Sequence, residues 1–279
     1  MIAMEQRLIF LDIDGTLTEP GSNTPPKSAL EAIRRARENG HLVFLCSGRN
    51  YDMLSPLLQY EFDGVAASSG GYVICGGEVI YDCPLTEEQK DRALRVLREN
   101  GVYCTVECRE GAFTDEGFKE FLRDKAGREG NSEMLRWREQ IEKTLNILPM
   151  KKYRGQPVYK ITVMSQSLDQ LRASQERLDQ DFAFCIQDLD QGGLVNGEVV
   201  NRKFDKGRAV LRVCNYLKIP VENSVAFGDS MNDREMIETA GLGICMENGS
   251  PQLKRIADDI CPPVGENGLW EGFRRHGLI

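Results

Sequence analysis

The sequence predicts an α/β fold: a Rossmann-like core with a parallel sheet, into which an α+β domain is inserted. In the first and last thirds of the 279 residues, short apolar runs alternate with segments of helical spacing. That alternation is typical of a parallel sheet with helices on both faces. The middle of the chain breaks the pattern. We therefore predict that residues 1–82 and 191–279 build the core and that residues 83–190 form the inserted domain.

The composition is that of a folded protein in a reducing compartment. Hydrophobic residues make up 41% and charged residues 28% of the chain, which suits a globular rather than a disordered protein. No apolar run approaches the roughly 20 residues that span a bilayer, and the N-terminus lacks the layout of a signal peptide. The nine cysteines are scattered without CxxC spacing, which favours reduced thiols over disulfides or a metal cluster. We expect a cytoplasmic protein without a membrane partner.

The charge balance argues against a nucleic-acid partner. The net charge of −8 and the pI near 5.1 argue against nucleic acid, because its phosphates attract basic surfaces. Only two histidines, His41 and His276, are present, which argues against catalysis by histidine. We expect the protein to act as a monomer or a homodimer.

Apolar periodicity and breaker residues predict the individual elements. In the first third we expect strands at 7–11, at 42–46 and near 65, and a hairpin formed by 72–75 and 79–81. We also expect two helices there, one that begins at Thr24-Pro25 and a second at about 52–60. In the middle we expect a helix from the Thr86/Gln89 capping box to 100, strands at 103–107, 158–164 and 182–187, a helix at 168–178, and a solvated helical face with a loop at 123–154. In the last third we expect helices from 206, 233 and 250, and strands at 224–227 and 242–246.

Two carboxylates follow the first predicted strand. Asp12 and Asp14 are one residue apart and precede Gly15. In an open parallel sheet, ligands bind beyond the carboxyl ends of the strands, so both carboxylates are expected in that crevice. Glycine permits a sharp turn that leaves backbone N–H groups available for an anion. The segment therefore predicts a site for charged chemistry.

A second strand is predicted to bring further carboxylates to the same edge. The apolar run 224–227 leads into Gly228-Asp229, and Asn232 and Asp233 follow. Several carboxylates in one crevice repel one another unless a cation lies among them. Because the ligands are all oxygens, we expect Mg²⁺ rather than zinc.

Two further segments supply groups that would bind a phosphate. Ser47-Gly48-Arg49 follows the strand at 42–46 and offers a hydroxyl and backbone amides. Lys206 opens a helix, where an ammonium group and the helix N-terminus would both stabilise an anion. Lys203 is close enough in sequence to be a rival for this role, and Arg49 could equally form a structural ion pair or contact the substrate.

Taken in order, these four segments resemble the four motifs of the haloacid dehalogenase superfamily. The chain is most similar to the Cof-type phosphatases, which carry a C2B-type cap inserted after the third strand. The resemblance includes the C-terminal stretches 257–259 and 266–268, and within the cap it rests on size and position. The sequence departs from the family pattern at 69–71, where Ser-Gly-Gly replaces the usual Asn-Gly, and at 246–248, where Met-Glu-Asn replaces Met-Gly-Asn.

The resemblance implies a Mg²⁺-dependent phosphohydrolase that acts on small phosphorylated metabolites, such as sugar phosphates, nucleotides or cofactor phosphates. Asp12 would be the nucleophile and form an aspartyl-phosphate, and Asp14 would be the general acid and base. The implied metal residues are Asp12, Asp14 through its backbone carbonyl, Asp229 and Asp233, with Asn232 or Asp233 binding directly or through water. The implied phosphate-binding residues are Ser47, Gly48, Lys206 and Asn232.

Other functions are compatible with the same motifs. A phosphomutase or phosphotransferase would pass the phosphoryl group to an alcohol instead of water, and a metabolite sensor would keep the fold without catalysis. A dehalogenase is disfavoured, because carbon–halogen displacement has no need for the acid and base that Asp14 supplies. The cap would select the leaving group, and its candidate cations are Lys151, Lys152, Arg154 and Lys160.

Overall fold

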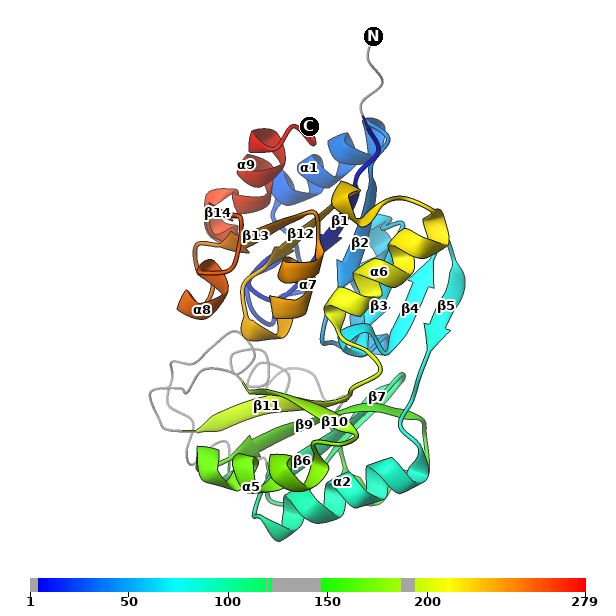
Figure 1. Ribbon diagram of the computed structural model, residues 1–279, viewed down its shortest axis with the longest axis vertical. Coiled ribbons are helices and arrows are strands. Elements are labelled where there is room, and N and C mark those ends of the chain that lie inside the picture. Colours follow the sequence, from blue (N-terminus) through cyan, green and yellow to red (C-terminus); the bar gives the residue numbers. More distant parts are fainter. Residues whose placement is uncertain (1–4, 119, 122–146, 187–193) are drawn as a thin grey trace. The chain divides into compact units, whose positions relative to one another are not determined.

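The computed structural model describes residues 5–118, 120–121, 147–186 and 194–279 (Figure 1). Within these ranges the chain divides into two compact units. The core unit comprises the chain up to Arg49, Leu54–Asp82 and Asp205–Ile279, and the inserted unit comprises Asn50–Met53 and Cys83–Phe204.

The core unit is built on an eight-stranded sheet with the order β14-β13-β12-β1-β2-β3-β4-β5. The strands are β1 (Leu8–Leu11), β2 (Leu42–Cys46), β3 (Gly64–Ala67), β4 (Tyr72–Cys75), β5 (Glu78–Asp82), β12 (Ser224–Gly228), β13 (Leu242–Met246) and β14 (Asp259–Cys261). The pairs from β14 through to β3 are parallel. Their carboxyl ends therefore lie along one edge of the sheet, where β1 occupies the centre.

The last two strands form the predicted hairpin. β4 pairs antiparallel with both β3 and β5. Gly76 and Gly77 join the hairpin strands with φ of 58° and 85°, the left-handed backbone that a two-residue hairpin turn of type I′ requires.

Helices cover both faces of the core sheet, as the alternating pattern predicts. On one face, α6 (Lys206–Leu217), α7 (Arg234–Thr239) and α8 (Pro251–Lys254) pack through Val210, Met236 and Leu253 against a cluster that includes Phe10 and Phe44. The two phenylalanines stack with their ring centroids 5.1 Å apart. On the other face lie α1 (Lys27–Glu38) and α9 (Gly268–Arg275), which contact each other, and Phe273 of α9 lies 5.2 Å from the ring of Phe227. The predicted α/β fold class is confirmed.

The inserted unit has a six-stranded sheet with the order β10-β11-β9-β6-β7-β8. The strands are β6 (Tyr103–Cys108), β7 (Gly111–Thr114), β8 (Ile147–Pro149), β9 (Val158–Ser165), β10 (Phe182–Ile186) and β11 (Val195–Asn201). One face packs against α2 (Glu87–Glu99) and α5 (Leu168–Leu178) through an apolar cluster that includes Leu97, Val106, Ile161 and Leu171. The Thr86/Gln89 capping box at the start of α2 is confirmed.

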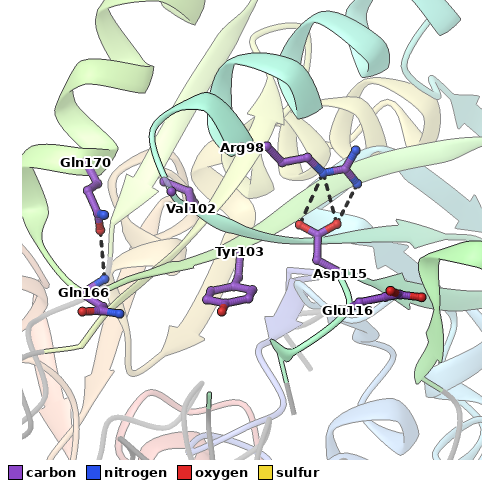
Figure 2. A pocket seen from close by; sticks show the side chains of 8 residues that line it. Arg98, Val102, Tyr103, Asp115, Glu116, Gln166 and Gln170 are labelled. Carbon is purple, nitrogen blue, oxygen red and sulfur yellow. Dashed lines mark hydrogen bonds and ion pairs between the residues drawn. The ribbon is translucent and has the colours of Figure 1, made fainter. Parts of the chain in front are cut away.

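A pocket of about 570 Å³ opens on the inserted unit near the ends of α2 and α5. Figure 2 shows that Arg98 donates to Asp115 there, and that the backbone N–H of Gln166 donates to the Gln170 side chain. None of the sequence-predicted catalytic, phosphate-binding or metal residues lines this pocket.

Two boundary predictions and one predicted helix were wrong. Helix α1 begins at Lys27 with Pro26 as its N-cap, because Pro26 keeps the residue before it out of the helical region. The predicted helix over 52–60 is instead two short 3₁₀ turns, Asp52–Leu54 and Leu58–Tyr60, with Pro56 between them.

The third error concerns the end of the inserted domain. The predicted boundary at 190 lies outside the described residues. Strand β11 pairs with β9 and β10, so 195–204 belong to the inserted unit and not to the core as predicted. The prediction for 123–154 also lies mostly outside the described residues; its described part contains β8 and a 3₁₀ turn at Met150–Lys152.

Two sequence expectations concern the whole chain. Across the described ranges, no helix is both long and apolar enough to span a bilayer. All nine cysteines lie in described ranges and are free thiols, seven of them buried.

Candidate active site

Three buried carboxylates meet at the carboxyl edge of the core sheet. Asp12 directly follows β1 and its N–H donates to the carbonyl of Phe227 in β12 at 3.0 Å. Asp229 follows β12, and Asp233 lies one 3₁₀ turn further on. One carboxylate oxygen from each of Asp12, Asp229 and Asp233 lies within 4.8 Å of the others, and all three residues are at most 5% exposed.

Lys206 lies among these carboxylates. Its Nζ donates to Asp12 Oδ1 at 2.6 Å and to Asp233 Oδ1 at 2.5 Å, and its side chain is fully buried. Lys206 is the first residue of α6, whose N-cap Asp205 accepts from the backbone N–H of Arg208. The rival Lys203 is exposed and lies in the inserted unit. The structure therefore brings Lys206, and not Lys203, to the nucleophile position.

Burial and charge shift the titration of this group. The pKa of Asp12 is raised from 3.8 to about 8, first because burial disfavours the carboxylate and next because Asp233 repels it; Lys206 opposes both effects. The pKa of Lys206 is held well above its usual value, since Asp12 and Asp233 outweigh the effect of burial on the ammonium. Burial and the nearby Asp233 carboxylate therefore favour the protonated form of Asp12 when Lys206 is the only cation beside it.

Asp233 organises the loop after β12. Its Oδ2 accepts from the backbone N–H groups of Asp229 at 3.0 Å and Ser230 at 3.1 Å, while its Oδ1 accepts from Lys206. Asn232 Oδ1 accepts from the Ser230 hydroxyl at 2.8 Å and from Lys206 at 3.3 Å. Asp233 thus fixes the position of Asp229 as well as contributing charge.

Asp14 forms a bidentate ion pair with Arg49. The Nε and one terminal nitrogen of Arg49 donate to the two carboxylate oxygens at 2.8 and 2.6 Å, and both residues are buried. The N–H of Gly21 also donates to Asp14, and Arg49 reaches Asn23 Oδ1 at 2.5 Å. The alternative of a structural ion pair for Arg49 is therefore the one seen here, and the Asp14 side chain is not part of the three-carboxylate group.

Ser47 and Gly48 lie beyond β2, the strand beside β1. The Ser47 N–H donates to the carbonyl of Ala66 in β3, and its Oγ accepts from the Arg49 N–H at 3.2 Å. Cys46 Sγ lies 3.9 Å from the carbonyl of Lys206. The segment that carries Ser47 thus adjoins the start of α6.

Gly15 lets the first loop pass close to Asp229. Its φ is +90°, and a Cβ placed on it would lie 2.4 Å from Asp229 Oδ2. Its carbonyl accepts from Asn248 Nδ2 at 2.8 Å. A side chain at this position would push on the carboxylate itself.

We predict that Gly15→Ala weakens the binding of divalent cation at least roughly tenfold, because it adds a clash with Asp229 to the backbone strain. Gly40→Ala is the matched control, since Gly40 has a φ of +88° with no atom within 4 Å of the added Cβ. Calorimetric titration with Mg²⁺ on both variants measures the effect. Equal Mg²⁺ affinity in the two variants would contradict a metal role for Asp229.

Several residues that shape the site escaped the sequence analysis. Gly21 and Asn23 hold the Asp14–Arg49 pair, and Ser230 orients Asn232. Asn248 was noted only as part of a departure from the family pattern. Of the four candidate cap cations, Lys160 is fully buried and paired with Glu198 and Glu107, whereas Lys151, Lys152 and Arg154 are exposed. No local sequence signal marks Asn23, because its partner Arg49 lies 26 residues away. Gly21 lies 7 residues from its partner Asp14 but contributes a backbone N–H, which does not depend on residue type.

Sequence comparison places the chain among hydrolases. Residues 9–273 match the family model of haloacid dehalogenase-like hydrolases. The putative phosphatase YkrA of Bacillus subtilis is 27% identical over 285 residues, covering 99% of this chain and all of that protein. The HMP-PP phosphatase of Yersinia pseudotuberculosis is 28% identical over 259 residues, covering 89% of this chain and 86% of that protein.

Solved structures share the fold over nearly the whole chain. The phosphatase BT1666 of Bacteroides thetaiotaomicron has a TM-score of 0.80 at 18% identity, covering 98% of this chain and 96% of that one. The sugar phosphatase BT4131, of haloacid dehalogenase subclass IIB, has a TM-score of 0.77 at 20% identity, covering 98% and 100%. A haloacid dehalogenase-like hydrolase from B. subtilis has a TM-score of 0.79 at 24% identity, covering 97% and 99%. Since the family match extends over both core segments and the insert between them, the chain belongs to the haloacid dehalogenase-like hydrolases.

Proposed function

We propose that this enzyme is a Mg²⁺-dependent phosphohydrolase that cleaves small phosphate monoesters through an aspartyl-phosphate on Asp12. The observation that carries the proposal is the position of Lys206, whose ammonium bridges Asp12 and Asp233 beside Asp229. A carboxylate nucleophile and a phosphate dianion repel each other, and a buried cation at the nucleophile offsets that repulsion.

The donor set fits a hard divalent cation. Carboxylate oxygens in a buried group are the ligands that Mg²⁺ prefers. We propose that Asp12, Asp229 and the Asp14 carbonyl hold the ion. Because both oxygens of Asp233 already accept from Lys206 and two backbone N–H groups, we assign Asp233 to orienting Asp229 or a water ligand. When bound, Mg²⁺ would neutralise phosphate charge and orient the ester.

In the first chemical step, an Asp12 oxygen attacks phosphorus and the bond from phosphorus to the leaving oxygen breaks. Asp14 gives its proton to that oxygen, then takes a proton from the water that attacks the aspartyl-phosphate. The second attack releases inorganic phosphate and restores the Asp12 carboxylate. For this work Asp14 must separate from Arg49, because a carboxylate held by a bidentate guanidinium is stabilised in its charged form.

Three groups would hold the phosphoryl oxygens during the transfer: the Ser47 hydroxyl, the backbone amide of Gly48, and the amide NH₂ of Asn232. The last assignment is supported by Asn232 Oδ1, which accepts from Ser230 and Lys206, so that the NH₂ end is the one to donate. Each is a hydrogen bond to a charged acceptor, the stronger class.

The substrate class follows from the relatives. Their printed names include a phosphatase for HMP-PP and a sugar phosphatase, and we propose that this enzyme likewise acts on small phosphorylated metabolites. The cytoplasm as its compartment and a monomer or homodimer as its assembly remain predictions.

Phosphate release from a panel of sugar, nucleotide and cofactor monoesters tests the proposal. We expect release with Mg²⁺ and loss of release, by at least roughly 10²-fold, when a chelator is added. A parallel reaction contains a sugar bisphosphate as activator. Isomerisation that depends on this activator, without free phosphate, would replace the hydrolase by a phosphomutase. A folded, Mg²⁺-binding protein that acts on no ester in either reaction would support the sensor.

A further inference from the structure

The turn after β3 has an unusual backbone. Ser68 and Ser69 have φ of 51° and 58°, and Gly70 follows with a φ of 90°. Two consecutive residues other than glycine in the left-handed region are rare, because the Cβ approaches the neighbouring carbonyl oxygen. Such strain persists where the surroundings fix the backbone, and it gathers at functional sites.

Contacts on both sides fix this turn. The N–H of Ser68 donates to the Arg49 carbonyl at 2.8 Å, and the N–H of Ser69 donates to the Ser47 carbonyl at 2.9 Å. On the other side, a Cβ on Gly70 would lie 2.5 Å from the carbonyl oxygen of Asp205. The turn therefore lies between the segment that carries Ser47 and Asp205, the residue before Lys206.

The hydroxyl of Ser68 is buried in this turn without a partner. Ser68 is 1% exposed, and its Oγ has no hydrogen bond within the described part of the chain. Leaving a buried hydroxyl unpaired is costly, so a partner is expected when the site is filled. Thr16 is the other residue whose hydroxyl is buried and unpaired among those described. It belongs to the loop after β1, so both hydroxyls follow strands whose carboxyl ends lie at the edge that carries the carboxylates.

We propose that Ser68 is a further substrate-contacting residue, whose hydroxyl donates a hydrogen bond to an oxygen of the phosphoryl group. The inference rests on the proposed function for the identity of that anion. The two backbone hydrogen bonds to the carbonyls of Arg49 and Ser47 hold the turn that carries this hydroxyl against the segment 47–49, which supplies the proposed phosphate-binding groups Ser47 and Gly48.

Two substitutions distinguish the effect of the Ser68 hydroxyl from the effect of the backbone strain. Ser68→Ala removes the hydroxyl and keeps the strain, whereas Ser68→Gly removes both. Lys218→Gly is the matched control, because Lys218 is exposed, has a φ of 57° and is the C-cap residue that follows α6. Glycine at such positions is expected to raise the melting temperature.

We expect kcat/KM to fall roughly 10- to 100-fold in both Ser68 variants, as for a lost hydrogen bond to a charged group. Ser68→Gly should melt no lower than the wild type, and Lys218→Gly should keep kcat/KM. The affinity for inorganic phosphate with Mg²⁺, measured by calorimetry, should fall in the Ser68 variants and not in the control. Because a structural role would be rescued by glycine, wild-type kcat/KM in Ser68→Gly would overturn the inference.

The phosphate titration separates the two proposals. If the wild type hydrolyses esters and Ser68→Gly binds phosphate as well as the wild type does, the Ser68 contact is wrong and the hydrolase stands. If the wild type hydrolyses no ester, but Ser68→Gly binds phosphate more weakly than the wild type does, the anion contact stands and the hydrolase does not.

Discussion

Asp12→Asn is expected to lower phosphate release by roughly 10³-fold or more, because an amide oxygen is a poor nucleophile and cannot form the aspartyl-phosphate. The fold should survive, since the amide keeps the size of the side chain and an acceptor for Lys206. Asp169→Asn is the matched control, because that carboxylate is 92% exposed. Release above about a tenth of the wild-type rate in Asp12→Asn would contradict the assigned nucleophile.

The same variant should change how stability depends on pH in the metal-free protein. The pKa of Asp12 is raised from 3.8 to about 8, so between these values the folded state holds a proton that the unfolded chain has lost. The stability that this group contributes is therefore present below about pH 4 and is lost as pH rises towards 8. Asp12→Asn should abolish this pH-dependent loss of stability, because the amide does not titrate. A difference of about 1 kcal/mol corresponds to roughly 2–4 °C in melting temperature.

Melting curves in chelator across this pH range measure the difference. We expect the wild type to lose more melting temperature between pH 4 and pH 8 than Asp12→Asn does. Parallel curves for the two proteins would mean that burial does not keep Asp12 protonated.

Lys206→Met should lower both the stability of the fold and the rate of phosphate release. It leaves Asp12 and Asp233 buried without their shared cation, and breaking a buried pair in this way costs about 3–5 kcal/mol. Phosphate release should fall roughly 10²- to 10³-fold, because the positive charge that offsets the repulsion between the carboxylate nucleophile and the phosphate is gone. Mg²⁺ should raise the melting temperature of this variant more than that of the wild type, since the ion replaces part of the lost charge.

Lys203→Met is the control for this experiment. Lys203 lies three residues earlier and is exposed in the inserted unit. Guanidinium unfolding and phosphate release should both stay near the wild type. If Lys203→Met lost activity while Lys206→Met stayed active, the role assigned to Lys206 would belong to Lys203.

The parts of the fold that could be predicted are those fixed by local pattern. The buried strands β1, β2, β12 and β13 follow from apolar runs, and α2 begins at its capping box. The parallel order then brings Asp12, Ser47 and Asp229 to one edge, which is why the sequence could predict their proximity. Strand β11 was missed because Asn196, Gly197 and Glu198 interrupt its apolar pattern; its place is set by pairing with β9 and β10.

The site geometry that escaped prediction depends on contacts between distant residues. Arg49 reaches Asp14 across 35 residues, and Asn248 reaches Gly15 across 233. No spacing rule predicts such pairs, so Arg49 could not be assigned from sequence. The choice between Lys203 and Lys206 likewise required knowing where the inserted unit ends, since only Lys206 belongs to α6.

The most direct test of the central claim is to trap the phosphoryl group on the protein. Asp14→Asn should slow hydrolysis of the intermediate, because the water then lacks its base, while an aryl phosphate with a good leaving group still reacts. After acid quench, peptide mass spectrometry should find the mass of one phosphoryl group on Asp12, and none when Asp12→Asn is added. A label on another residue, or none despite release of the aryl alcohol, would contradict Asp12 as the carrier.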